Sequence, residues 1–321
     1  MSKDLYSQER WEKVNEVNKE LMELFLRSVR GDRKRPNTCS EYKYDLRFFL
    51  IWNLLYNNNL NVLECKKRNF EDFKFFMTDE RNVSAARANR LLCVVRRMMA
   101  YAEDDDDQYE GYMRNVAAKV KSLEKKPVKD TTFLKQEQID LLRSYLIDNN
   151  MYQHLCLLDI FYDTGARISE ILQVKNTDTL QRGYIKVECK GGEMQYILIH
   201  EHSFESIKLH LSVKKEGEAF WKSKCGPVIK TATLRGWVKE LYEILKELDT
   251  KTPYFTPHSF RHTFLENTTN GTHYICKKIG RALTMEEAQM LAHHKSIDMT
   301  KSYLKPKDDE LIFGLFGIKI S

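Results

Sequence analysis

Apolar residues recur at helical spacing in the first third of the chain. The stretch EYKYDLRFFLIWNLLYN predicts a helix, with Ser40 as its N-cap. The residues on its apolar face are Tyr42, Leu46, Phe49, Leu50 and Leu54.

A second helix is predicted after Ser84, in SAARANRLLCVVRRMMAYAE. Its apolar stripe consists of Leu91, Val94, Val95, Met98 and Met99. Its arginines lie largely off the stripe, and they are Arg87, Arg90, Arg96 and Arg97. A solvated helix face explains them, and so does a surface that contacts a polyanion.

One later segment alternates instead of following the helical period. GYIKVECKGGEMQYILIH is rich in Ile, Val and Tyr on both sides of Gly191–Gly192, which predicts a β-hairpin with Lys190 directly before the turn. The remainder of the second part indicates helices. The expected fold is therefore mainly α with a small β-hairpin or sheet.

Composition narrows the class of protein. Lys and Arg exceed Asp and Glu by 52 to 46, a net charge of +6, which is modest for a nucleic-acid-binding protein. The 7 cysteines include no C-x-x-C pair, which argues against a zinc site and a disulfide framework. The charged N-terminus and the lack of a long apolar run predict a soluble cytoplasmic protein.

Polar residues suited to chemistry lie in three later stretches. TGARISEILQVK places Arg167 at the start of a helix, and TPHSFRHTFLE places His258 and Arg261 one turn apart after Pro257. LAHHKSIDMTKSYLK contains Tyr303 after two adjacent histidines. Each has an ordinary explanation alone, such as a salt bridge, a solvated turn or packing.

Together, and in this order, these stretches resemble the tyrosine recombinase (phage integrase) family. TGARISEIL is similar to the first arginine box, and PHSFRHTF to the H-x-x-R box. HKSIDMTKSY is similar to the final box, with Tyr303 nine positions after His294. The similarity runs from about residue 38 to the end of the chain.

The resemblance implies a two-domain organisation that closes as a C-shaped clamp around DNA. It divides the chain into an N-terminal helical extension at 1–37, a helical core-binding domain at 38–120, a basic linker at 121–131, and a catalytic-type domain with a C-terminal tail at 132–321. The implied DNA contacts are Arg87, Arg90, Arg96, Arg97, Lys121, Lys125, Lys126 and Lys129.

The resemblance also implies the catalytic roles. Two guanidinium groups suit the extra charge of a pentacoordinate phosphorus, and these are Arg167 and Arg261. Tyr303 is the implied nucleophile and Lys190 the general acid. The assisting histidines are His258 and His294. No metal or other cofactor is implied, and the H-x-x-x-H spacing of His258 and His262 lacks the glutamate of a zinc-protease motif.

Two features depart from the family pattern. His293 stands where the family usually has glycine, so His293 competes with His294 for the role of final-box histidine. The stretch between Arg261 and His294 is longer than usual, and the additional residues lie in THYICKKIGRALTMEEAQ.

Two functions follow as hypotheses. The first is a site-specific recombinase or integrase of a phage or mobile element, acting on double-stranded DNA as a dimer or tetramer that assembles through the C-terminal tail. The second is a sequence-specific DNA-binding regulator, similar to a phage repressor, that has lost or does not use the recombinase activity. The fold does not separate them.

Overall fold

The computed structural model describes residues 5–31, 36–105, 107–124, 132–174, 183–189, 192–228 and 230–293. The chain divides into two compact units, Met1–Pro127 and Val128–Ser321. Each unit has its own hydrophobic core. The C-shaped clamp around DNA stays a prediction.

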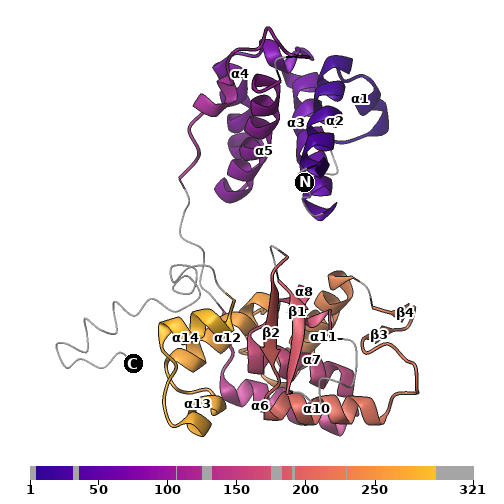
Figure 1. The fold of residues 1–321 in the computed structure, drawn as a ribbon, viewed down its shortest axis with the longest axis vertical. Coiled ribbons are helices and arrows are strands. Elements are labelled where there is room, and N and C mark those ends of the chain that lie inside the picture. Colours follow the sequence, from indigo (N-terminus) through magenta and orange to yellow (C-terminus); the bar gives the residue numbers. More distant parts are fainter. Residues whose placement is uncertain are drawn as a thin grey trace, which may run out of the picture. The chain divides into compact units, whose positions relative to one another are not determined.

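The first unit is helical. In chain order, its elements are α1 (Gln8–Glu12), α2 (Glu16–Gly31), α3 (Pro36–Tyr56), η2 (Val62–Glu64), α4 (Lys67–Phe75), η3 (Phe76–Glu80), α5 (Ala85–Glu103) and η4 (Val116–Lys119) (Figure 1). Apolar side chains of α2 to α5 form one core, to which the segment before residue 38 contributes Leu21, Met22 and Leu26.

The predicted stripe of α5 is confirmed, since all five of its residues are at most 2% exposed. Ser84 is the N-cap, as predicted, and its Oγ accepts the backbone N–H of Arg87 at 3.3 Å. The prediction for Ser40 was wrong, because α3 already begins at Pro36. Proline is favoured in the first turn of a helix, where its missing N–H leaves no hydrogen bond unmade.

The second unit is also mostly helical, as predicted. Its elements are α6 (Gln136–Asp148), α7 (Tyr152–Thr164), α8 (Ile168–Ile171), β1 (Tyr184–Glu188), β2 (Met194–Leu198), α10 (Glu201–Ser212), β3 (Lys222–Ser223), β4 (Gly226–Pro227), α11 (Thr231–Leu248), α12 (Pro257–Thr269), α13 (Tyr274–Ile279) and α14 (Met285–Leu291) (Figure 1). Helix α7 is central, since it is buried from Leu155 to Thr164 and packs against α6, α10 and α12.

The predicted hairpin is confirmed. Strands β1 and β2 are antiparallel, with pairs running from Tyr184 opposite Leu198 to Glu188 opposite Met194. Beyond the last pair, the backbone N–H of Cys189 donates to the carbonyl of Glu193 at 2.8 Å. The second pair, β3 and β4, was not predicted, because two residues per strand are too few to show an alternating pattern.

Gly165 positions the first arginine box. It ends α7 with φ +59°, a left-handed conformation that glycine adopts without strain. A Cβ at this position would lie 2.6 Å from Cδ1 of Phe264 in α12, so glycine also permits the close approach of the two helices. No helix within the described ranges is long and apolar enough to span a bilayer.

Candidate active site

Arg167 begins α8 and is held there by Glu170. Its backbone N–H donates to Oε2 of Glu170 at 2.8 Å, and its Nη1 donates to Oε1 of the same carboxylate at 2.9 Å. The Glu170 side chain is fully buried, whereas that of Arg167 is 19% exposed. Sequence reasoning missed Glu170, although a glutamate three residues after a helix start is a signature of a capping box.

Arg261 lies on α12, one turn after His258, as predicted. It is only 1% exposed, and it is among the largest fully buried side chains. Its Nη1 donates to the carbonyl of Gly165 at 2.8 Å, and its Nη2 donates to the carbonyl of Ala292. A buried guanidinium is stable because such carbonyls replace its lost water.

Both arginines reach the same backbone segment after α14. Arg261 donates to the carbonyl of Ala292, and Nη2 of Arg167 lies 3.5 Å from the carbonyl oxygen of His293. Side chains from α8 and α12 therefore converge on residues 292–293. The resemblance implied that the two arginines act together, and in the structure both reach this segment.

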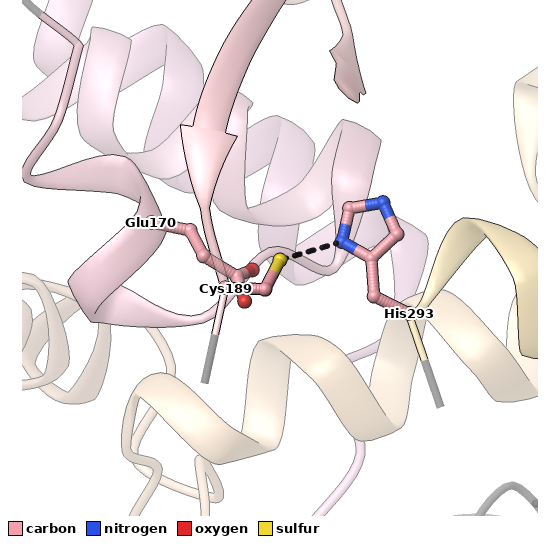
Figure 2. Close-up of side chains that lie close together, drawn as sticks. All are labelled: Glu170, Cys189 and His293. Carbon is pink, nitrogen blue, oxygen red and sulfur yellow. Dashed lines mark hydrogen bonds between the residues drawn. The ribbon is translucent and has the colours of Figure 1, made fainter. Parts of the chain in front are cut away.

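Cys189 and His293 meet beside this pair (Figure 2). Sγ of Cys189 lies 3.4 Å from Nδ1 of His293, and Nε2 of His293 lies 3.1 Å from the carbonyl oxygen of Tyr196. Burial, and secondly the nearby Glu170 carboxylate, raises the pKa of the Cys189 thiol to about 12. The thiol therefore keeps its proton and can donate it to a hydrogen bond.

Glu170, Cys189 and His293 are also the one group of three candidate metal ligands found among the residues described. Carboxylate, thiol and imidazole are zinc ligand types. Both oxygens of Glu170, however, already accept hydrogen bonds from Arg167. The hydrogen bonds account for this grouping without an ion.

His258 is an exposed residue near the start of α12. Its pKa is lowered, first by partial loss of water and then by the positive charges of His262, Arg261, Arg167 and Arg235. Its imidazole is therefore neutral at neutral pH and able to accept a proton. The ring of His262 meets that of Phe133 edge-on, with 6.0 Å between the ring centroids, so His262 has a packing contact.

The additional residues between Arg261 and the final box form α13 and α14. They pack on the end of α12, where the carbonyl of Thr268 accepts the backbone N–H of Leu283 at 2.9 Å and the thiol of Cys276 at 3.3 Å. The imidazole of His273 accepts the N–H of Ile275 and caps α13. The longer spacing thus adds structure beside the site.

The arginines predicted to contact DNA all have partners within the first unit. Arg87 and Arg90 pair with the buried carboxylate of Asp45, at 2.5 and 3.3 Å. Arg90 also pairs with Glu41 at 3.0 Å.

Arg96 and Arg97 donate to uncharged carbonyl and hydroxyl groups instead. Arg96 donates to the carbonyl of Ala117 at 3.3 Å, to that of Val120, and to Oγ of Ser122 at 3.2 Å. Arg97 is exposed and donates to the hydroxyl of Tyr42. The contacts of Arg96 hold η4 and the segment directly after it, so Arg96 has a structural role.

Of the predicted linker contacts, Lys121 is described and exposed. The predictions for Lys125, Lys126, Lys129, Lys190, His294, Tyr303 and the C-terminal tail fall outside the described residues.

Comparison with known proteins identifies the family. The model of the phage integrase family matches residues 132–310, more than half of the chain. The chain therefore belongs to the phage integrase family of tyrosine recombinases. The match includes both arginines of the site and extends over the final box.

Individual relatives cover nearly the whole chain. Tyrosine recombinase XerC of Treponema denticola is 26% identical over 313 residues, which cover 88% of this chain and 93% of the relative. Tyrosine recombinase XerD of Yersinia pestis is 24% identical over 296 residues, which cover 88% and 91%.

Solved structures of integrases share the fold. A lambda integrase dimer bound to a COC′ core site gives a TM-score of 0.64 at 16% identity, over 91% of this chain and 77% of that one. The Tn1549 transposon integrase in complex with circular intermediate DNA gives 0.64 at 15% identity, over 92% and 99%.

Proposed function

We propose that this chain is a site-specific DNA recombinase or integrase of a phage or mobile element, which cleaves and rejoins DNA through a 3′-phosphotyrosyl intermediate. The observation that carries the proposal is the convergence of Arg167 and Arg261 on residues 292–293. That segment leads directly in sequence to His294 and, nine positions later, to Tyr303.

The proposed cleavage step assigns one role to each catalytic side chain. The phenolic oxygen of Tyr303 attacks the scissile phosphorus, and the bond from phosphorus to the 5′-oxygen breaks. His258 accepts the phenolic proton, Lys190 donates a proton to the departing 5′-oxygen, and His294 assists at the phosphate. The new phosphotyrosyl bond conserves the energy of the broken one, so rejoining needs neither ATP nor a metal ion.

The two guanidinium groups stabilise the charge that develops on the non-bridging oxygens. Arg167 is partly exposed and already oriented by Glu170. Arg261 is 1% exposed and donates to the carbonyl of Ala292, so we infer that the scissile phosphate binds beside this carbonyl and that the contact with Ala292 is kept when DNA binds.

The proposed partner is double-stranded DNA, bound by both units. The lambda integrase structures, one a dimer on a core site and one a tetramer on a Holliday junction, support assembly on DNA. We propose that residues 311–318 of the tail dock on a neighbouring copy. Deleting the residues after Pro306 should abolish cooperative complexes and leave single-site binding, whereas unchanged cooperativity would refute the docking.

One observation favours a second function, that of a DNA-binding regulator. The guanidinium of Arg261 is enclosed by carbonyls of the protein itself, as in a site that has become structural. A regulator would bind its operator with the same two units and leave the phosphodiester intact.

A suicide substrate separates the two functions. The cognate site is selected from fragments of the host element, a nick is placed beside the scissile phosphate, and the products are run on a denaturing gel. The proposed recombinase forms a covalent adduct that is lost in Tyr303→Phe and retained in Tyr242→Phe, a control tyrosine of α11. Tight, specific binding with no adduct would instead establish the regulator.

A further inference from the structure

His293 has an unusual backbone for its residue type. It follows the C-cap of α14 with φ +52°, in the left-handed region that costs most residues about 1–2 kcal/mol. The other non-glycine residues with positive φ in the described ranges are all asparagines. A glycine would adopt this backbone without strain. The contacts of the histidine side chain must therefore offset the strain that its backbone conformation costs.

That side chain contacts strand β2 at Tyr196 and the residue directly after β1, Cys189. Nε2 lies 3.1 Å from the carbonyl oxygen of Tyr196, which can only accept, so Nε2 carries the proton and donates. Nδ1 is then the acceptor, and it faces Sγ of Cys189 at 3.4 Å. Figure 2 shows the imidazole of His293 turned toward Cys189, with its second nitrogen on the far side of the ring.

The backbone of the same segment is contacted by the two arginines. Arg261 donates to the carbonyl of Ala292, and Arg167 reaches the carbonyl of His293. Residues 292–293 therefore contact both parts of the site. The carbonyls of these two residues face the arginine pair, and the imidazole of His293 contacts the hairpin. Lys190 is the next residue in sequence after Cys189.

We propose that His293 is a positioning residue that fixes the hairpin relative to the arginine pair and so sets the reach of the general acid Lys190. The inference rests on the proposed function, because it concerns how the acid is delivered. It assigns His293 a role beside the final-box histidine rather than in its place. Loss of the imidazole should slow protonation of the leaving oxygen and leave DNA binding intact.

The test uses the full chain on two suicide substrates, one normal and one with sulfur replacing the bridging 5′-oxygen. A thiol has a pKa of about 8.5, so a departing thiolate needs no proton from the enzyme. A defect in delivering the acid is rescued by this substrate, whereas a defect in the arginine pair is not. Lys190→Ala serves as the reference for a missing acid, and Arg167→Gln as the reference for a damaged phosphate site.

We expect His293→Gly to bind DNA like the wild type and to form adduct roughly 10- to 100-fold more slowly on the normal substrate, the range expected for a misplaced catalytic group. The rate should recover on the sulfur substrate, as for Lys190→Ala. Glycine keeps the left-handed backbone, and His293→Asn, also tolerant of positive φ, provides the same comparison if the glycine variant does not fold.

Three results would overturn the inference and leave the proposed function standing. An unchanged rate for His293→Gly would show that the contacts have no role in cleavage, and a defect that persists with sulfur would place the role of His293 at the arginines. A normal rate for Lys190→Ala would remove the acid that His293 is said to position. Absence of any wild-type adduct would refute the proposed function itself, and this inference with it, so the two failures are told apart.

Discussion

Glu170 binds Arg167 at two points, through the backbone N–H at 2.8 Å and through Nη1 at 2.9 Å. The carboxylate of Glu170 is fully buried, so water does not compete for it. The pair fixes both where α8 begins and where the guanidinium points.

Glu170→Gln should therefore reduce cleavage while changing the fold little. An amide of the same size keeps one acceptor but loses the charge-assisted bond, which is about twice as strong as a neutral one. We expect adduct formation to slow roughly tenfold, equivalent to about 1.4 kcal/mol. Single-turnover rates would measure this.

The matched control is Glu287→Gln, which breaks an exposed pair with Arg281 at 2.6 Å. Exposed pairs contribute about 0–1 kcal/mol, so this variant should cleave at the wild-type rate. Equal rates for the two variants would contradict the role given to Glu170.

Gly165→Ala should destabilise the second unit. The new Cβ would occupy a backbone with φ +59° and lie 2.6 Å from the Phe264 ring. We expect the free energy of unfolding to fall by about 2–5 kcal/mol, from backbone strain and overpacking together.

Gly236→Ala in α11 is the control, because nothing lies within 4 Å of its added Cβ. In a helix this change should stabilise by about 0.5–1 kcal/mol. Denaturant melts of both variants check the pair, and a neutral Gly165→Ala would show that α7 and α12 are not packed as described.

His273 should make stability depend on pH in the acid range. Burial lowers the pKa of its imidazole from 6.5 to about 4. Below about pH 6.5 the unfolded chain takes up a proton that the folded chain refuses, so stability is full above this pH and falls as pH drops toward about 4. The loss amounts to about 3 kcal/mol.

Urea melts at a series of pH values measure this slope. His273→Asn keeps a side-chain acceptor for the N–H of Ile275 and removes the titrating group. The variant should lose the part of the pH dependence between pH 4 and 6.5. An unchanged slope would assign it to other groups.

Substitutions of Arg96 and Arg97 should have different effects, the first on stability and the second on DNA binding. Arg96 holds three groups between Ala117 and Ser122, so Arg96→Gln should lower stability by about 1–3 kcal/mol. Arg97 is exposed. We expect Arg97→Gln to reduce the slope of log K against log salt by about 1, as for one phosphate contact. Binding isotherms in increasing salt test both, and equal slopes for Arg97→Gln and wild type would remove Arg97 from the interface.

Adduct formation should be unaffected by a chelator. Positive charge at the phosphate comes from guanidinium groups, and the carboxylate of Glu170 is already bound by Arg167. A rate that falls in EDTA and recovers with zinc would show that Glu170, Cys189 and His293 hold an ion.

Local patterns predicted the elements well. The apolar stripe of α5, the alternation of the hairpin and the placement of His258 and Arg261 on one helix all follow from short-range periodicity. The start of α3 did not, because the helix-starting preference of Pro36 outweighed the capping preference of Ser40.

The partners of the functional side chains could not be predicted in this way. Asp45 lies far along the chain from Arg87, and Ala292 from Arg261, so their contacts depend on how helices pack rather than on spacing. The resemblance indicated that His293 replaces a glycine. Only the folded chain shows that its imidazole lies between Cys189 and Tyr196.

We propose that this chain cleaves DNA with Tyr303 at the site formed by Arg167 and Arg261. The most direct measurement is mass spectrometry of the adduct trapped on a suicide substrate, after digestion with trypsin and nuclease. We expect a nucleotide remnant on the peptide that contains Tyr303, and none with Arg167→Gln. A remnant on any other residue, or no remnant from a protein that binds its site tightly, would contradict it.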